Sequence, residues 1–257
     1  MIDFNYHTHT ARCGHATGTE EEYIQNAIDA GIKYMGFSDH MAFEWNGKEA
    51  PFRVPVARAK EYCDTIRTLA EKYRDKIEIK VGFEMEYYRD SFEKMLYDAV
   101  KYGAEYLILG PHCLKPDYPD AQHTHGLNSD DEDFLEEYVS LVCEAIKTGV
   151  FTYVAHPDII TFYGDIDDYR EKMRRICVAS REYNTPLEIN FLGIREGRFY
   201  PKNEFWKVAG EEQSPVTFGF DAHDPSAAGD IASLKHAEML VKKYNLNYIG
   251  KPEIKEI

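Results

Sequence analysis

The feature that most constrains the fold is an alternation of short apolar runs with segments of helical period. Runs rich in β-branched and aromatic residues predict strands at 3–9, 33–39, 77–86, 105–112, 151–156, 186–192 and 215–222. Between them, apolar residues recur every three or four positions, as on the buried face of a helix. This alternation predicts parallel strands covered by helices, in either an open doubly wound sheet or a closed barrel.

Four of the predicted helices have clear signatures. The first is introduced by Thr19-Glu20-Glu21-Glu22, which has the pattern of a capping box. The others carry one apolar face each along residues 59–73, 166–183 and 231–244. We expect these helices to cover the outside of the sheet.

Potential metal ligands stand at the C-terminal ends of nearly all the predicted strands. They are His7, His9, Asp39, His40, Glu84, Glu86, His112, His156, Asp158, Asn190, Asp221 and His223. Barrel enzymes build their active sites at this end, where the strands converge. An open sheet would spread these side chains along an edge, whereas a barrel gathers them into a ring. We therefore expect a single α/β domain over residues 1–257, a TIM-like barrel of about seven strands.

The residue types at these positions fit metal chemistry. Neutral imidazole and carboxylate groups are the usual ligands of zinc, manganese and iron. Residues two apart on a strand share a face, so His7 and His9 can bind one ion together, and Asp221 and His223 have the same spacing. One histidine near a strand end is more often a hydrogen-bonded structural residue, but six of the ten histidines gather at these ends. That segregation favours a metal site.

The five cysteines form no C-x-x-C pair, which argues against a disulfide framework or a structural zinc ribbon. Cys63, Cys143 and Cys177 fall on apolar helix faces and are expected in the core. Cys13 and Cys113 lie close to histidines of the proposed site, where each is a candidate metal ligand or nucleophile.

Charge and hydropathy limit the partners. The net charge of −15 opposes binding of long nucleic acid, but it does not exclude a small phosphorylated substrate held by ions within a pocket. No run approaches the roughly 18 apolar residues that span a bilayer. The segment 1–6 lacks the features of a signal peptide, so the expected compartment is the cytoplasm.

In order and spacing, seven sequence elements resemble the PHP (polymerase and histidinol phosphatase) family, and within it the histidinol-phosphate phosphatases. They are His7-Thr8-His9, Cys13-Gly14-His15, Gly36-Phe37-Ser38-Asp39-His40, Gly82-Phe83-Glu84, His112, His156-Pro157-Asp158 and Asp221-Ala222-His223. The resemblance covers essentially the whole chain. It implies a distorted (β/α)7 barrel that holds two to three divalent ions of zinc, manganese or iron.

The resemblance also implies a distribution of ligands over three ions. The first would be bound by His7, His9, Glu84 and Asp221; the second by Glu84, His112 and His156; and the third by His15, His40 and His223. Two such ions turn a bridging water into hydroxide near neutral pH, and we expect this hydroxide to attack phosphorus. Asp221 and His223 are candidates to protonate the leaving alcohol, and a metal-bound water is an alternative.

Phosphate also needs positive partners, and the segment after the sixth strand offers two. Arg195 resembles the phosphate-binding arginine of histidinol phosphatases, and Arg198 is a second candidate. A surface salt bridge to Glu196 or another carboxylate is the alternative role of Arg195. The chain departs from the family after His156-Pro157-Asp158, where Thr161 or Phe162 stands in place of a basic residue.

Two further features can shape the pocket. The segment 115–125 ends in His123-Thr124-His125, which we expect to be exposed or lid-forming rather than another metal site. Glu86 is a candidate to orient a metal ligand.

The favoured function is hydrolysis of L-histidinol phosphate in histidine biosynthesis. The alternatives are a PHP phosphoesterase acting on nucleotides or short oligonucleotides and a non-catalytic metal-binding domain. A non-catalytic domain would be indicated if residues unable to bind metal stood at some of the ligand positions, but every position holds a competent ligand. An amidohydrolase would need a bridging lysine in place of Glu84.

Overall fold

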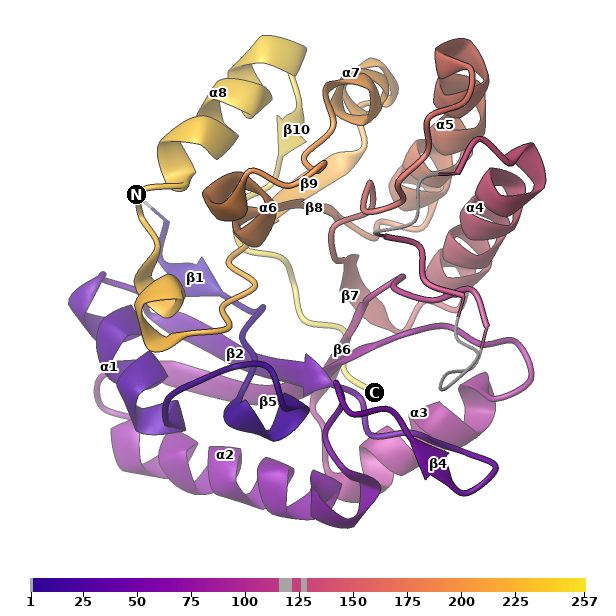
Figure 1. Cartoon of the computed structure of the whole chain (residues 1–257). Helices are drawn as coiled ribbons and strands as arrows, with labels where there is room; N and C mark the ends of the chain where they lie inside the picture. The colour runs from indigo at the N-terminus through magenta and orange to yellow at the C-terminus, as the bar shows by residue number, and fades with distance from the viewer. Residues whose placement is uncertain (1, 116–121, 126–128) are drawn as a thin grey trace.

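The computed structural model describes residues 2–115, 122–125 and 129–257, and its centre is a curled sheet of parallel strands (Figure 1). The strands follow one another in the order β1, β2, β5, β6, β7, β8, β9 and β10. They are β1 (Phe4–Asn5), β2 (Tyr34–His40), β5 (Glu78–Met85), β6 (Tyr106–Leu109), β7 (Phe151–Val154), β8 (Leu187–Asn190), β9 (Pro215–Gly219) and β10 (Asn247–Tyr248). A separate hairpin of β3 (Glu44–Trp45) and β4 (Lys48–Glu49) lies outside this sheet.

The helices lie around the outside of the curled sheet (Figure 1). They are α1 (Glu20–Asp29), α2 (Ala59–Tyr73), α3 (Phe92–Tyr102), α4 (Glu132–Lys147), α5 (Ile166–Glu182), α6 (Phe191–Glu196), α7 (Asn203–Glu212) and α8 (Leu234–Tyr244), with 3-10 turns η1 (Ala11–Cys13), η2 (Val56–Arg58) and η3 (Pro225–Gly229). Among the described residues, no helix combines the length and the apolar character needed to cross a membrane.

The sheet curls so far that the segments following β1 and β9 meet. Thr8 and Ala222 form a parallel bridge, and the amide of His9 donates to the carbonyl of Ala222 at 3.0 Å. The amide of Ala222 in turn donates to the carbonyl of His7 at 3.2 Å. These bonds join the residues that follow the carboxyl ends of β1 and β9, and the predicted TIM-like α/β fold is confirmed.

The eighth strand, β10, was not predicted. It has two exposed residues and pairs with the first residues of β9. A two-residue exposed strand has no buried face, so it leaves no alternation in the sequence. The other seven strands fall within the predicted ranges, apart from a one-residue extension of β2 to His40.

The predicted helix signatures are largely confirmed. Thr19 caps α1 in a complete capping box with Glu22, and Cys63, Cys143 and Cys177 are buried on α2, α4 and α5. The predicted last apolar face was too long, because α8 begins at Leu234 and Ile231 is 46% exposed.

The predicted strand 186–192 is also too long, because β8 stops at Asn190. There the Asn190 side chain accepts a hydrogen bond from the Gly193 amide at 3.0 Å and starts α6. A side chain that caps a helix ends the strand before it, and this places residues 191–196 on a helix at the mouth of the barrel.

Candidate metal centre

A pocket of about 430 Å³ opens among the segments that follow the strands. Seven of the nine metal-ligand candidates line it, namely His15, His40, Glu84, His112, His156, Asp221 and His223. The remaining two, His7 and His9, are fully buried and contact the Glu84 and Asp221 carboxylates. The fold thus brings the whole predicted set together from six strands.

The most buried ligands surround Glu84 and Asp221. The Nε2 atoms of His7 and His9 each lie 3.6 Å from Oε2 of Glu84, and they lie 3.5 and 3.2 Å from Oδ1 of Asp221. Neither Nε2 atom nor either Glu84 oxygen has a hydrogen-bond partner. Buried polar atoms without partners are costly, so the two Nε2 atoms and the Oε2 atom of Glu84, which face one another, fit a divalent cation.

Glu84 also faces a second group of imidazoles. Its Oε1 lies 2.9 Å from Nε2 of His156 and 3.4 Å from Nε2 of His112, while its Oε2 lies 3.2 Å from Nδ1 of His40. One carboxylate therefore presents its two oxygens to different sets of nitrogen atoms, which suits a ligand that bridges two ions.

A third group lies nearer the surface. The Nε2 atoms of His15 and His223 are 3.0 Å apart, and His40 offers a nitrogen within 4.8 Å of both. Nδ1 of His15 faces the carbonyl of Cys13 at 3.0 Å, so it carries the proton. Nδ1 of His223 faces the Asp221 carbonyl at 3.3 Å. The two Nε2 lone pairs then face each other, and a cation between them removes their repulsion.

Carboxylates stand behind three of the imidazoles, and those beside His7 and His112 form hydrogen bonds that fix the ring. Nδ1 of His7 lies 2.7 Å from Glu188, Nδ1 of His9 lies 3.5 Å from Asp39, and Nδ1 of His112 lies 3.1 Å from Glu86. A carboxylate on the far nitrogen sets the tautomer and raises the basicity of the nitrogen that binds metal.

Glu188 was missed by the sequence reasoning. It is fully buried, and its second oxygen accepts hydrogen bonds from the His156 amide at 2.9 Å and the Asn190 side chain at 2.8 Å. A charged residue in the middle of an apolar strand, two residues before Asn190, was the available signal. Asn190 also donates to Asp221 at 3.1 Å, so it positions that carboxylate.

Two of the ligand candidates have unusual backbone conformations. His156 has a φ of +29° and Asp221 a φ of +48°, in the left-handed region that residues with a Cβ seldom adopt. Such strain persists only where the surroundings hold it in place, and it concentrates at functional sites. Both side chains are turned into the pocket by these conformations.

Burial and neighbouring charges act strongly on the ionisation of the centre. Burial acts against charge on Glu84, but His112, His7 and His40 hold the pKa of this carboxyl well below its ordinary value. Burial likewise opposes charge on His7, but Glu188, Asp221 and Glu84 hold its pKa well above the usual one. Burial, followed by the charge of His9, holds the pKa of His40 well below normal. The centre therefore keeps its carboxylates ionised among imidazoles.

The two candidate arginines lie in different places. Arg195 is ion-paired with Asp230 at 2.8 Å and donates to the carbonyls of Phe220 at 3.4 Å and Asp221 at 3.3 Å. It braces the segment that carries Asp221 and does not line the pocket. Arg198 does line it, and among the described residues of the lining it is the one arginine or lysine.

Arg198 is held by two neighbours. Its Nε donates to Glu196 at 2.7 Å and its Nη1 donates to the hydroxyl of Tyr200 at 3.2 Å. Glu196 and Tyr200 also line the pocket. The alternative role predicted for Arg195, a salt bridge to a carboxylate, is found with Asp230, while Glu196 pairs with Arg198.

The remaining wall is aromatic. Phe52 and His123 have ring centroids 5.9 Å apart, and His125 lies beside His112, at a centroid distance of 6.1 Å. All four rings line the pocket. In the segment 115–125, which we expected to shape the pocket, residues 116–121 lie outside the described residues. Thr161 and Phe162, the two residues at which a basic side chain was expected from the resemblance, are both buried, and the amide of Thr161 donates to the carbonyl of Thr124.

Comparison with known proteins agrees with this geometry. The PHP domain family model matches residues 5–191. The "Probable histidinol-phosphatase" of Deinococcus radiodurans is 28% identical over 87% of this chain and 87% of its own length. The "Histidinol-phosphatase" of Bacillus subtilis is 23% identical over 88% of this chain and 94% of its own.

A solved structure shares the fold along nearly the whole chain. The histidinol phosphate phosphatase of Lactococcus lactis, in complex with zinc, L-histidinol and phosphate, superposes with a TM-score of 0.72. The two chains are 20% identical, and the match covers 98% of each.

Proposed function

Since the chain belongs to the PHP domain family, we propose that it is a metal-dependent phosphomonoesterase that hydrolyses L-histidinol phosphate to L-histidinol and phosphate. The observation that carries the proposal is the convergence of buried, unpartnered nitrogen and oxygen atoms on one pocket beside an arginine. Similarity to histidinol phosphatases over most of the chain supports the choice of substrate. This activity would place the protein in histidine biosynthesis.

We propose two to three divalent ions in this centre. His7, His9, Glu84 and Asp221 would hold the first; Glu84, His112 and His156 the second; and His15, His40 and His223 the third. Zinc, manganese and iron all suit this ligand set. When bound, such ions supply Lewis acidity and lower the pKa of water so that hydroxide is available near neutral pH.

Arg198 is the proposed contact for the phosphoryl group. Its guanidinium offers several donors, and Glu196 and Tyr200 fix its direction at the pocket wall. Arg195 is proposed instead to position Asp221, because its donors are occupied by Asp230 and by the backbone on either side of that ligand. This assigns different roles to the two arginines.

The rest of the pocket suits the organic half of histidinol phosphate. That molecule carries an ammonium group and a flat imidazole ring. The carboxylate of Glu196 can accept the ammonium group, and the rings of Phe52 and His123 provide a surface against which a flat ring can stack. Nucleotides would bring a larger base and no ammonium group to the same wall.

The leaving alcohol needs a proton when the bond to phosphorus breaks. Nδ1 of His223 and Oδ1 of Asp221 lie 3.2 Å apart at the pocket wall. We propose that this pair holds the proton that the alcohol takes up. The side chain of His223 is 19% exposed, so it can recover a proton from solvent after each turnover.

The test is phosphate release by protein loaded with zinc or manganese. L-Histidinol phosphate is compared with AMP, a nucleoside 3′,5′-bisphosphate and p-nitrophenyl phosphate. The proposal predicts a kcat/KM for histidinol phosphate at least about a hundredfold above the others. Faster turnover of the nucleotides would overturn the substrate and leave metal-dependent hydrolysis in place.

The two arginines supply the matched variants for this assay. Arg198→Ala is expected to raise KM for histidinol phosphate by about tenfold or more, because a charge-assisted hydrogen bond contributes roughly 1.5–3 kcal/mol. Arg195→Ala is expected to lower kcat with little change in KM. An equal rise of KM in both variants would contradict the separate roles.

A further inference from the structure

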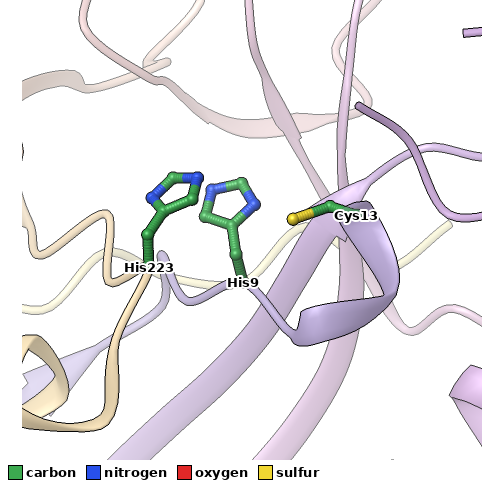
Figure 2. A group of neighbouring side chains, drawn as sticks. All are labelled: His9, Cys13 and His223. Atoms are coloured by element: carbon green, nitrogen blue, oxygen red, sulfur yellow. The ribbon is translucent and has the colours of Figure 1, made fainter. Parts of the chain in front are cut away.

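Cys13 and Cys113 each have a sulfur beside a histidine, and that of Cys13 faces residues of the proposed metal centre. Cys63, Cys143 and Cys177 lie on helix faces packed in the core. Cys13 is fully buried too, but its Sγ lies 3.9 Å from Nε2 of His15. Figure 2 shows its sulfur directed at the ring of His9, with His223 on the other side of that ring. Cys13, His9 and His223 offer ligand atoms within 4.8 Å of one another.

The local backbone brings the thiol and His15 to the same side. Cys13 ends η1, and Gly14 follows with a φ of +80°. A Cβ at Gly14 would lie 2.6 Å from the carbonyl oxygen of Pro51, so this turn requires glycine. The carbonyl of Cys13 then accepts the Nδ1 proton of His15, which turns the lone pair of Nε2 toward the sulfur and His223.

His9 is already engaged elsewhere. Its Nε2 faces Asp221 and Glu84, and its Nδ1 faces Asp39 at 3.5 Å. The other neighbours of the sulfur, His15 and His223, are proposed ligands of the third ion. The sulfur therefore belongs to the site of that ion rather than to a separate site with His9. His40 completes this group, and its buried Nδ1 has no hydrogen-bond partner.

We propose that Cys13 is a thiolate ligand of the third ion, together with His15, His40 and His223; this rests on the proposed metal centre. In a tetrahedral zinc site, bond lengths of about 2.3 Å to sulfur and 2.0–2.1 Å to nitrogen place these atoms about 3.6 Å apart. The separation of 3.9 Å between Cys13 and His15 is close to that value. Binding replaces the S–H bond by a sulfur–metal bond and releases one proton to solvent.

A thiolate would distinguish this site from the other two. The ligands around Glu84 are nitrogen and oxygen atoms, which also suit manganese, whereas sulfur favours zinc or iron. The third site would then select a softer ion than its neighbours. Four protein ligands would also close it, as in structural zinc sites, and so fix the first loop over the pocket.

The test replaces the bound ions with cobalt and records the near-ultraviolet spectrum, where a thiolate bound to cobalt gives a charge-transfer band. The wild type and the Cys113→Ser and Cys63→Ser controls are expected to show the band, and Cys13→Ser is expected to lose it. Cys113 is the stringent control, because its sulfur lies 3.4 Å from Nδ1 of His123. A band that survives Cys13→Ser would overturn the proposal.

X-ray absorption at the zinc edge of the wild-type protein also tests whether sulfur binds the metal. It needs no variant, so a folding defect cannot affect the result. One sulfur at about 2.3 Å, averaged over the bound ions, is the expected result. A protein that carries three ions, hydrolyses histidinol phosphate and shows no sulfur ligand would overturn the role of Cys13 alone. A protein that binds no metal would overturn the proposed function with it.

Discussion

The proposed ligands fall into two regions that are held in different ways. The deep cluster, made of His7, His9, Glu84 and Asp221, is at most 3% exposed. The rim cluster, made of His15, His40 and His223, includes one exposed histidine and one that is partly exposed. In the deep cluster the Nδ1 atoms of His7 and His9 face buried carboxylates, whereas at the rim Nδ1 of His15 faces a backbone carbonyl and Nδ1 of His223 faces both the carbonyl and the carboxylate of Asp221.

The difference shows how one fold can supply both a fixed and an adjustable part of a metal centre. Deep ligands stand on or beside paired strands, so their positions follow from the barrel itself. Two of the three rim ligands, His15 and His223, stand on segments outside the strands, and the turn at Gly14 places His15. We therefore expect activity to respond less to the loss of a rim ligand than to the loss of a deep one.

The largest effect is expected from the centre of the deep cluster. Glu84→Gln removes the charge that both deep ions would share, so kcat for histidinol phosphate should fall by about a thousandfold or more. Phosphate release and metal content are measured on the same sample. Glu182→Gln, an exposed position on α5, is the control and should match the wild type. More than a tenth of wild-type activity in Glu84→Gln would contradict a bridging role.

A smaller effect is expected one layer behind the deep ligands. Glu188→Gln leaves His7 without its carboxylate, and loss of such a partner typically costs about 10- to 100-fold in metal affinity or activity. The affinity is measured by zinc competition with a chromophoric chelator. An unchanged affinity would mean that the carboxylates behind the deep cluster do not account for its rigidity.

The rim should respond less. His15→Ala removes one exposed ligand, and we expect the bound metal to drop by about one ion per chain while kcat/KM falls about tenfold. Elemental analysis after gel filtration counts the ions. Loss of all the ions together would show that the two clusters are one cooperative unit.

The smallest effect is expected far from both clusters. Thr19→Ala removes the side chain that caps α1 and should lower the free energy of unfolding by about 1 kcal/mol. Urea unfolding of the metal-loaded protein measures this. Metal content and kcat/KM should not change; a change in either would mean that α1 helps to position the rim cluster.

Much of the deep cluster could be predicted from the sequence, because strand ends in parallel folds converge and residues two apart share a face. His7 with His9, and Glu84 on β5, follow from that rule alone. Strand β8 shows where this rule fails to predict the site. Asn190 caps α6 and ends the strand, and Glu188 becomes a support for His7 through contacts across the barrel.

The arginines show a second limit. Arg195 and Arg198 are three residues apart, and both stand near the predicted phosphate site. Which one faces the pocket depends on where α6 ends, at Gly197 with a φ of +63°, and on the partner that Asp230 offers to Arg195. The glycine is local, but Asp230 lies 35 residues beyond Arg195, so the ion pair that turns Arg195 away from the pocket is not visible in the local pattern.

The most direct test of the whole account is to measure metal content and phosphate release together. The protein is stripped with a chelator and then reloaded stepwise with zinc or manganese, with L-histidinol phosphate as substrate. The account predicts that activity disappears with the metal, returns as the deep cluster fills, and is complete at two to three ions per chain. Full activity on histidinol phosphate with less than one ion per chain would contradict it.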